Sequence, residues 1–281
     1  MPEGDTIFRA AQTLHRALAG RIVTRFESVF PRLARVDDDH PIAGRTIESV
    51  TSRGKHLLFA FSGDLVLHTH MRMNGSWHLY RPDDRWQRPA RDMRVLVETA
   101  EAVAVGFNVP IAELLSSREM LRHTELRALG PDLLAAEFDR DEAIGRLRER
   151  KGDPIGDALL NQRVLSGIGN MFKSEILFIA RVNPFAPVAE LSDAALGGIV
   201  EISLRQLRLN VAGRSRTMAP AGGRRTTGSL HPSKGLWVYG RAGQPCRRCG
   251  TVIQAKKTGP DARLTYWCPQ CQARAGLTAQ R

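Results

Sequence analysis

The sequence contains no long hydrophobic run, although hydrophobic residues make up 42% of its 281 residues. No apolar stretch approaches the roughly 18 residues that a membrane-spanning helix needs. The N-terminus also lacks the basic segment and the following apolar segment that mark a secretory signal, and no stretch of the chain repeats another. These absences favour a globular, cytoplasmic protein without a membrane partner, long enough for a large core and more than one domain.

Acidic residues are missing from one long stretch of the chain. Residues 205–257 contain no Asp or Glu, whereas the whole chain carries 29 acidic and 41 basic residues and a net charge of +12. A high net charge by itself is explained equally well by solubility. Basic residues gathered in an acid-free stretch favour a nucleic-acid partner, because Lys and Arg displace the counterions of phosphate groups. The basic residues of this stretch are Arg205, Arg208, Arg214, Arg216, Arg224, Arg225, Lys234, Arg241, Arg247, Arg248, Lys256 and Lys257.

Cysteine is also scarce, and Cys246, Cys249, Cys268 and Cys271 all lie near the C-terminus. Their spacing, C-x2-C-x18-C-x2-C, is typical of a site in which four thiolates hold one zinc ion. Two disulfides would use the same residues, but a reducing compartment disfavours them. Because four thiolates leave no position for water, we expect a single structural Zn²⁺.

The segment between the two cysteine pairs predicts a β-hairpin, with short strands at 251–253 and 264–267. The turn between them, residues 256–263, is basic and contains Gly259 and Pro260. A zinc-held hairpin with a basic tip suits a DNA groove, although an ordinary zinc ribbon has the same pattern.

The first half of the chain predicts one helix followed by many strands. The helix is expected to begin near Asp5, with Asp5 or Thr6 as its N-cap, and to end at Gly20. After it, short runs rich in Val, Ile, Leu and aromatic residues alternate with turn residues. The expected strands are 21–30, 46–52, 55–61, 65–70, 76–80, 93–99 and 102–107. Many short strands at this spacing favour a sandwich or a barrel.

The second half predicts helices, beginning after Gly130-Pro131-Asp132. Helices are expected at 140–150, 157–165, 170–180 and 192–210, followed by a Gly, Arg and Ser-rich loop at 212–235. In the segment LLNQRVLSGIGNMFKSEILF (159–178), the Gly-rich turn 166–169 places Asn170 at the start of a helix, where free N–H groups attract anions. Most such turns have only a structural role, so this segment alone does not decide whether a phosphate binds here.

Together these motifs resemble the Fpg/Nei family of DNA glycosylases. The matching motifs, in chain order, are the MPEG start, RGKHLL at 53–58, GPDLL at 130–134, GIGN at 167–170 and YWCPQCQ at 266–272. The resemblance covers roughly residues 1–272. The MPEG start and YWCPQCQ resemble the endonuclease VIII (Nei) branch, which excises oxidised pyrimidines and cleaves the strand by β,δ-elimination.

The resemblance implies a multi-domain α+β fold. An N-terminal catalytic β-sandwich with a leading helix would span residues 1–130, a helical helix–two-turns–helix DNA-binding domain 131–235, and a zinc-finger β-hairpin 236–272. It also implies a monomer that binds double-stranded DNA containing oxidised bases or abasic sites in a cleft. The damaged nucleotide would be flipped out of the helix.

The resemblance assigns the chemistry to Pro2 and Glu3. Removal of Met1 would expose the Pro2 amine, and the pKa of an α-amino group is ordinarily about 7.7–8.0, against about 10.4 for a lysine side chain. A secondary amine that attacks C1′ of the sugar forms an iminium ion, which acts as an electron sink for elimination. Glu3 would serve as the acid–base carboxylate. Without the resemblance, both residues would be ordinary parts of a helix leader.

Other residues would hold the DNA. Lys55 and Arg263, counted with the catalytic site, and Asn170 match the family's phosphate contacts. An arginine suits this role because its planar fork bonds phosphate at two points. The loop Arg72-Met73-Asn74 would fill the gap that the flipped nucleotide leaves, with Met73 as an apolar wedge.

The sequence departs from the family pattern at three places. Asp5-Thr6 stands where the family has Pro-Glu, so a second carboxylate is missing at position 6; either Asp5 substitutes or Glu3 acts alone. Asn161 replaces the usual Asp of LLDQ, and Arg72-Met73-Asn74 differs from the Gln-Leu-Tyr of the Nei branch. These departures leave open an Fpg-like preference for oxidised purines. A non-catalytic zinc-containing protein that binds damaged DNA is the other alternative, and such a protein would need neither Pro2 nor Glu3.

Overall fold

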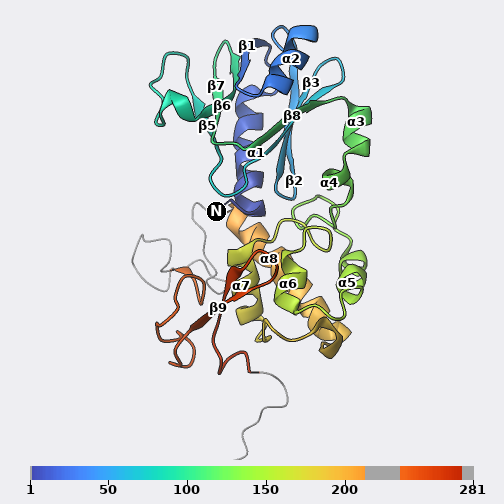
Figure 1. Ribbon diagram of the computed structural model, residues 1–281, viewed down its shortest axis with the longest axis vertical. Helices are drawn as coiled ribbons and strands as arrows, with labels where there is room; N and C mark the ends of the chain where they lie inside the picture. Colours follow the sequence, from blue (N-terminus) through green and yellow to red (C-terminus); the bar gives the residue numbers. More distant parts are fainter. Residues whose placement is uncertain (1, 213–234, 274–281) are drawn as a thin grey trace, which may run out of the picture. The chain divides into compact units, whose positions relative to one another are not determined.

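The structure is a computed structural model in which residues 2–212 and 235–273 are described. The chain divides into two compact units, with the boundary between Ala128 and Leu129 (Figure 1). Within the described residues, no helix is both long and apolar enough to cross a membrane. Residues 213–234 of the predicted 212–235 loop lie outside the described residues.

Unit 1 is a β-sandwich of two four-stranded antiparallel sheets. One sheet has the order β1 (Val23–Ser28), β6 (Met93–Thr99), β7 (Val103–Phe107), β5 (Ser76–Tyr80). The other has the order β2 (Ile47–Arg53), β3 (His56–Phe61), β4 (Leu65–His70), β8 (Ile111–Leu115). The predicted strands are thereby confirmed, and β8 is an additional edge strand. The hydrophobic core includes Phe59, Phe61, Leu67 and Val97.

Helices border this sandwich. Helix α1 (Gly4–Leu18) packs beside β2 and buries Ile7, Ala11, Leu14 and Leu18 as one stripe at helical spacing. Its N-cap is Glu3, so the expectation that Asp5 or Thr6 caps this helix is wrong. Sequence reasoning did not find the short helices α2 (Pro31–Asp39), α3 (Ser117–Arg122) and α4 (Thr124–Arg127) or the 3-10 turn η1 (Ala90–Asp92).

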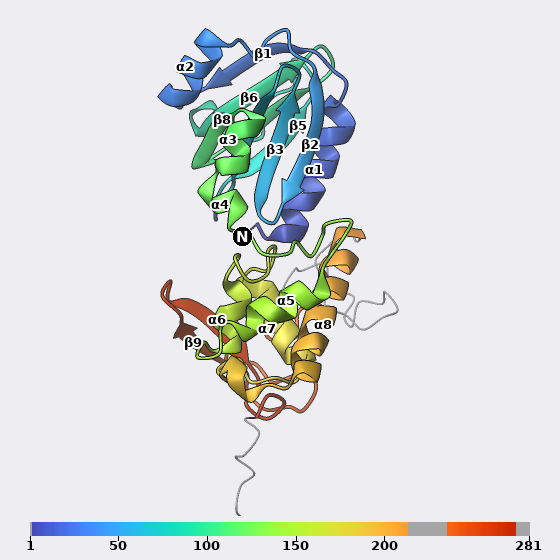
Figure 2. The ribbon, with the colours of Figure 1, turned by 90° about the vertical axis from the view of Figure 1, so that its right-hand side faces the viewer.

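Unit 2 combines helices with the cysteine-bearing hairpin. Its helices are α5 (Arg140–Arg148), α6 (Ile155–Leu160), α7 (Asn170–Ile179) and α8 (Asp193–Ala212), with the 3-10 turn η2 (Val188–Glu190). Strands β9 (Gln254–Thr258) and β10 (Arg263–Trp267) form the antiparallel hairpin. Helix α7 is buried along nearly its whole length and contacts α6, α8 and β10. Figure 2 shows α7 among the other helices of this unit. It is therefore the central element of this unit.

Two predicted boundaries in unit 2 are wrong. The helix expected at 157–165 ends at Leu160, because Asn161 adopts an extended backbone and its Oδ1 accepts the N–H of Arg163 in a turn. The strand expected at 251–253 is only an isolated bridge between Val252 and Pro245, and the hairpin strand begins at Gln254.

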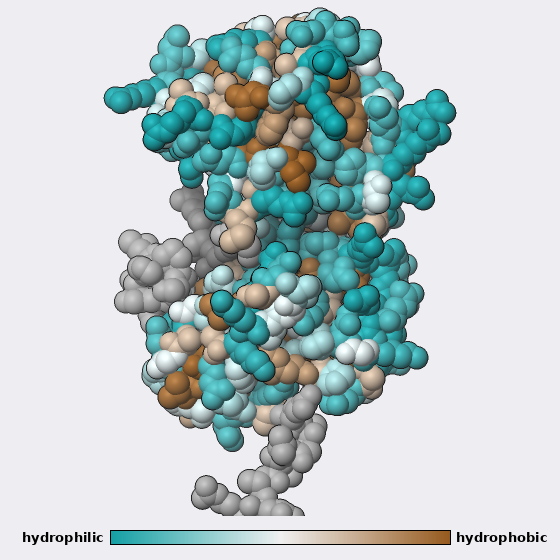
Figure 3. Space-filling view, in the orientation of Figure 1, coloured by the Kyte–Doolittle hydropathy of each residue, from teal (hydrophilic) through white to brown (hydrophobic). Residues whose placement is uncertain are grey.

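Hydrophilic side chains cover most of the face of both units shown in Figure 3, and hydrophobic ones form small separate patches. Among the described residues, the large hydrophobic side chains that are exposed include Met73 at 65% and Leu121 at 74%. Single exposed apolar residues are common on protein surfaces, so these exposures alone do not mark a binding surface.

Candidate functional site

The N-terminal residues are held against unit 1. Glu3 is only 1% exposed, and its carbonyl oxygen accepts the backbone N–H groups of Thr6 at 2.9 Å and Ile7 at 3.1 Å. Pro2, immediately before it, is half-buried. The first turn of α1 thus fixes Glu3 in place, which differs from the freely solvated side chain that an N-terminal glutamate usually has.

Asp5 provides a second buried carboxylate next to Glu3. Its side chain is fully buried; Oδ1 accepts the Thr6 hydroxyl at 3.2 Å, and Oδ2 lies 3.8 Å from the Arg9 guanidinium. A buried carboxylate needs such partners, because desolvation disfavours its charge. The departure at Asp5-Thr6 therefore leaves a carboxylate in this turn, one position earlier than the family pattern.

Lys55 lies at the tip of a tight hairpin. Arg53 of β2 pairs with His56 of β3, so Gly54 and Lys55 form a two-residue turn. Gly54 has a φ of +58°, which glycine adopts without steric cost. The half-buried Lys55 side chain therefore projects from a rigid element.

The predicted wedge loop lies beside that hairpin. His70, the last residue of β4, pairs with His56, the first residue of β3, so the chain that follows His70 leaves the sheet at the end where Lys55 turns. The backbone N–H of Arg72 bonds to Nδ1 of His70 at 3.0 Å, and Gly75 donates to the carbonyl of Met71 at 2.9 Å. A Cβ atom on Gly75 would lie 2.6 Å from that carbonyl oxygen. The closed turn therefore exposes Arg72, Met73 and Asn74.

The start of α1 lies at the same end of unit 1. Helix α1 runs alongside β2, and both views place its N-terminal end beside the end of β2 (Figures 1 and 2). Within unit 1, the structure therefore places the segments that carry Pro2, Glu3, Lys55 and the loop 72–74 at the same end.

In unit 2, Asn170 and the hairpin that carries Arg263 are directly connected. Asn170 is 7% exposed at the start of α7, and its Nδ2 donates to the carbonyl of Leu264 at 2.8 Å. Its Oδ1 is buried and has no hydrogen-bond partner among the described residues. The neighbouring Arg263 sits at the start of β10, where its guanidinium pairs with Asp261 at 3.1 Å. Two of the three predicted phosphate contacts thus lie on adjoining elements.

Two charged residues of α7 were missed by sequence reasoning. Lys173 is fully buried and its Nζ donates to the Thr265 hydroxyl of β10 at 2.7 Å. Glu175 is fully buried and accepts the backbone N–H groups of Trp237, Val238 and Tyr239, each at 2.8 Å. Burial raises the pKa of Glu175, while these N–H groups oppose the rise. Their signal in the sequence was two charges inside an otherwise apolar helix.

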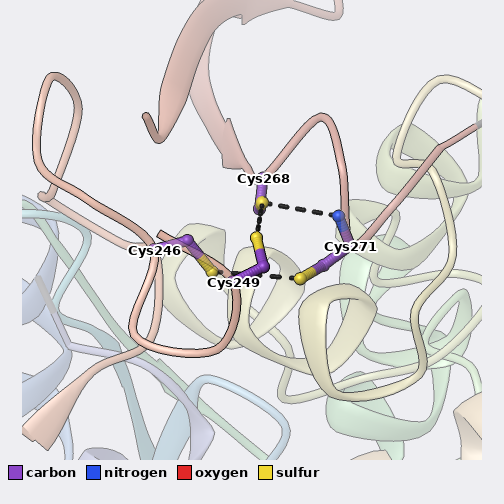
Figure 4. A group of neighbouring side chains, drawn as sticks. All are labelled: Cys246, Cys249, Cys268 and Cys271. Atoms are coloured by element: carbon purple, nitrogen blue, oxygen red, sulfur yellow. Dashed lines mark hydrogen bonds between the residues drawn. The ribbon is translucent and has the colours of Figure 1, made fainter. Parts of the chain in front are cut away.

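The four cysteines converge in unit 2, as Figure 4 shows. All are free thiols, and their Sγ atoms lie within 4.8 Å of one another. Cys249 and Cys268 approach to 3.5 Å, and Cys246 and Cys271 to 3.9 Å. Hydrogen bonds from Thr251 lower the pKa of Cys249 to about 6, whereas burial raises the pKa of Cys268. All four Sγ atoms face one common point, and a zinc ion deprotonates the thiols that bind it, so this donor set fits Zn²⁺.

Comparison with known proteins extends these observations. Family models match in order: the formamidopyrimidine-DNA glycosylase N-terminal domain at residues 1–130, the H2TH domain of that glycosylase at 129–219, and the zinc finger found in FPG and IleRS at 243–274. The finger match includes all four clustered cysteines. The predicted zinc site is thereby confirmed.

Curated relatives match along nearly the whole chain. The probable endonuclease 8 2 of Streptomyces coelicolor is 44% identical over 276 residues, covering 97% of this chain and 94% of that protein. The DNA-(apurinic or apyrimidinic site) lyase Nei2 of Mycolicibacterium smegmatis is 40% identical over 275 residues, covering 97% of this chain and 99% of that protein.

A solved structure of MutM in complex with DNA containing carbocyclic 8-oxo-G has the same fold. The TM-score is 0.80 at 24% identity, and the match covers 97% of this chain and 100% of that one. The expected fold of N-terminal β-sandwich, helical domain and zinc-finger hairpin is confirmed. From the family models and the relatives, the chain belongs to the Fpg/Nei family of DNA glycosylases and abasic-site lyases.

Proposed function

We propose that this glycosylase and abasic-site lyase acts in base excision repair on oxidised pyrimidines, with Pro2 as its nucleophile. Two of the relatives most similar in sequence carry the names endonuclease 8 2 and Nei2, which supports the Nei branch. The YWCPQCQ sequence of the finger supports the same branch. The observation that carries the proposal is the fixed, buried position of Glu3 next to Pro2 at the start of α1.

In this mechanism the Pro2 nitrogen attacks C1′ of the damaged nucleotide and the base leaves with a proton. The amine loses its proton and its lone pair forms an iminium with C1′ as the C1′–O4′ bond breaks and O4′ takes up a proton. Loss of a 2′ proton then releases the 3′ phosphate, and loss of the 4′ proton releases the 5′ phosphate. Glu3 moves the protons, because a positioned carboxylate within reach of the sugar supplies general acid–base catalysis. The buried setting of Glu3 limits competition from water.

The remaining residues hold the DNA in this proposal. Lys55, Asn170 and Arg263 contact phosphates near the lesion, and the loop 72–74 enters the stack through Met73. The hydrogen bond from Asn170 to Leu264 supports a joint role for Asn170 and Arg263, because Nδ2 keeps a second N–H for a phosphate oxygen. The substrate in this view is duplex DNA, bound by a monomer.

The functional division we propose has three parts: catalysis in 1–130, DNA binding by the helical part in 131–235, and the zinc finger in 236–272. Trapping with borohydride on abasic-site DNA tests the lyase step. The processed protein, without Met1, is expected to form a covalent complex, and a form carrying an uncleaved N-terminal extension is expected to form none.

Matched variants separate chemistry from folding. Pro2→Gly and Glu3→Gln are expected to lower base excision by about 10²-fold or more, because the first replaces the secondary amine by a primary one and the second removes the acid–base carboxylate. Pro31→Gly, at the start of α2, and Glu48→Gln, on the exposed part of β2, serve as controls and are expected to keep full activity. Equal activity of the Pro2 and Pro31 variants would contradict the assignment of the nucleophile.

Substrate preference is tested with duplexes that contain thymine glycol, 5-hydroxyuracil or oxidised guanine. We expect faster excision of the two pyrimidines. Action on oxidised guanine alone would replace this proposal with the Fpg-like alternative.

A further inference from the structure

A second group of metal-binding side chains lies in unit 1, and the proposed repair chemistry does not use it. His68 lies on β4, Glu113 on β8, and His123 between α3 and α4. His68 Nδ1 lies 3.3 Å from Oε2 of Glu113, and His123 Nε2 lies 3.0 Å from the same oxygen. The three donor atoms all lie within 4.8 Å of one another.

We propose that His68, Glu113 and His123 bind a second divalent transition-metal ion, for which Zn²⁺ is the best match to the donor set. Zinc bonds of about 2.0–2.2 Å to nitrogen and oxygen place tetrahedral ligands about 3.4 Å apart. The separations of the two imidazole nitrogens from the Glu113 oxygen, 3.3 and 3.0 Å, are close to this value, so a small outward movement of that carboxylate admits an ion. Imidazole nitrogens bind zinc and other borderline transition metals well. A carboxylate also binds harder ions, but it is a common ligand of zinc as well.

Three protein ligands leave one position of a tetrahedral ion open, unlike the four-thiolate site of the finger. The site also has an entry path, because the side chains of Glu113 and His123 are 44% and 17% exposed while that of His68 is fully buried. Water or a small anion completes the coordination in this arrangement. The bound ion joins β4 and β8 to the α3–α4 segment.

His56 supplies the outer contact that metal-binding histidines usually have. Its Nδ1 lies 2.8 Å from Nε2 of His68, and both side chains are buried. With the metal on Nδ1, His68 carries its proton on Nε2 and donates it to His56. Without the metal, His68 donates from Nδ1 to Glu113, so metal binding reverses the tautomers of both rings.

The electrostatic setting is consistent with metal binding. Burial lowers the pKa of His68, which favours the neutral imidazole, although the hydrogen bond to Glu113 opposes this. Burial opposes ionisation of Glu113, but the hydrogen bonds from His68 and His123 outweigh it and lower the pKa of that carboxyl. Deprotonated ligands are the form that a metal requires.

Metal binding has an identifiable cost at His123. Its Nδ1 accepts the backbone N–H of Leu126 at 3.3 Å and so caps α4. A metal on Nε2 places the proton on Nδ1, and this cap bond is lost. The Leu126 amide is therefore expected to change its NMR shift when the ion binds.

Counting metal ions in the full chain tests the proposal. The protein is incubated with excess Zn²⁺ and freed of unbound metal by gel filtration. Elemental mass spectrometry then gives the number of zinc ions per chain. We expect two zinc ions per chain in the wild type and one in His123→Asn, whose amide still caps α4. His78→Asn is the matched control, because His78 lies on β5 in the other sheet, and it is expected to keep two.

The finger is separated from this site by the double variant Cys268→Ser, Cys271→Ser, which is expected to retain one ion. In the wild type, ¹⁵N spectra of the imidazoles are expected to show the tautomer reversal of His68 and His56 on zinc addition, a readout that needs no variant. A single ion per chain, absent from the double cysteine variant, together with unchanged imidazole spectra, would overturn the proposal and leave a hydrogen-bonded cluster only.

Discussion

Replacement of Glu175 by glutamine is expected to weaken the connection between α7 and the start of the finger. The Glu175 carboxylate accepts three backbone N–H groups, those of Val238 and Tyr239 on Oε1 and that of Trp237 on Oε2. These residues precede the first cysteine pair. The carboxylate thus holds the chain at the point where it enters the zinc-binding segment.

The size of the effect follows from the number of acceptors. Glutamine keeps one oxygen for Val238 and Tyr239 but directs an NH2 group at the N–H of Trp237. One hydrogen bond to a charged acceptor is lost and one buried donor stays unmatched, which together cost about 2–4 kcal/mol. Alanine at this position removes all three acceptors and leaves a cavity, so we expect a loss of about 5 kcal/mol.

Urea unfolding, followed through tryptophan fluorescence and zinc release, measures this effect. Zinc release is expected at lower urea in Glu175→Gln than in the wild type. Glu201→Gln is the matched control, because Glu201 is an exposed residue of α8 and its change is expected to stay within about 0.5 kcal/mol. Release of zinc at the same urea concentration in Glu175→Gln and in this control would contradict the reasoning. It would mean that the hydrogen bonds to Glu175 do not stabilise residues 237–239 and the zinc-binding segment that follows them.

Three further substitutions test other parts of the structure. Cys268→Ser is expected to lower the zinc affinity of the finger strongly, measured by competition with a chelator, because a thiolate ligand is lost. Met73→Ala is expected to reduce excision from duplex DNA without changing the urea midpoint, whereas Leu79→Ala, also an exposed apolar residue, should leave excision unchanged. Ser116→Ala removes a capping box and should cost about 1 kcal/mol. Hydrogen bonds from Ser116 also lower the pKa of Glu119 below its usual 4.5. The stabilisation from this pair is therefore present above pH 4.5 and is lost as the pH falls through the folded-state pKa. Urea unfolding of wild type and variant, above pH 4.5 and below the folded-state pKa, measures this difference.

The strands were predictable because their pattern is local. Apolar residues in short runs, separated by Gly, Asp and Pro, specify where each strand begins and ends. Strand β8 escaped this reasoning because its sequence, Ile-Ala-Glu-Leu-Leu at 111–115, does not alternate between apolar and polar residues, in keeping with its uniformly half-buried side chains. Helix α2 escaped it because Leu33 is its one buried residue, and a helix with so narrow an apolar face has no stripe.

The site was only partly predictable, for a related reason. The four cysteines form a local pattern whose chemistry is specific. Lys55 and Met73 have no such signal, since a lysine or a methionine in a turn is common, and the resemblance to a family alone singled them out. The bond between Asn170 and Leu264 joins residues 94 positions apart, and no spacing rule predicts it.

The position of the candidate active site in unit 1 therefore depends on strand register as much as on its own residues. The pairing of His56 with His70 places the Lys55 turn beside the loop that exposes Met73. A shift of one residue between β3 and β4 would turn buried residues such as Phe59 and Leu67 toward the opposite face. Phe59 and Leu67 pack in the core of the sandwich, and the loss of that packing opposes the shift. The hydrophobic pattern of the sheet thus sets the spacing of polar residues that have no part in the core, and a substitution deep in β3 is expected to affect DNA cleavage through this register.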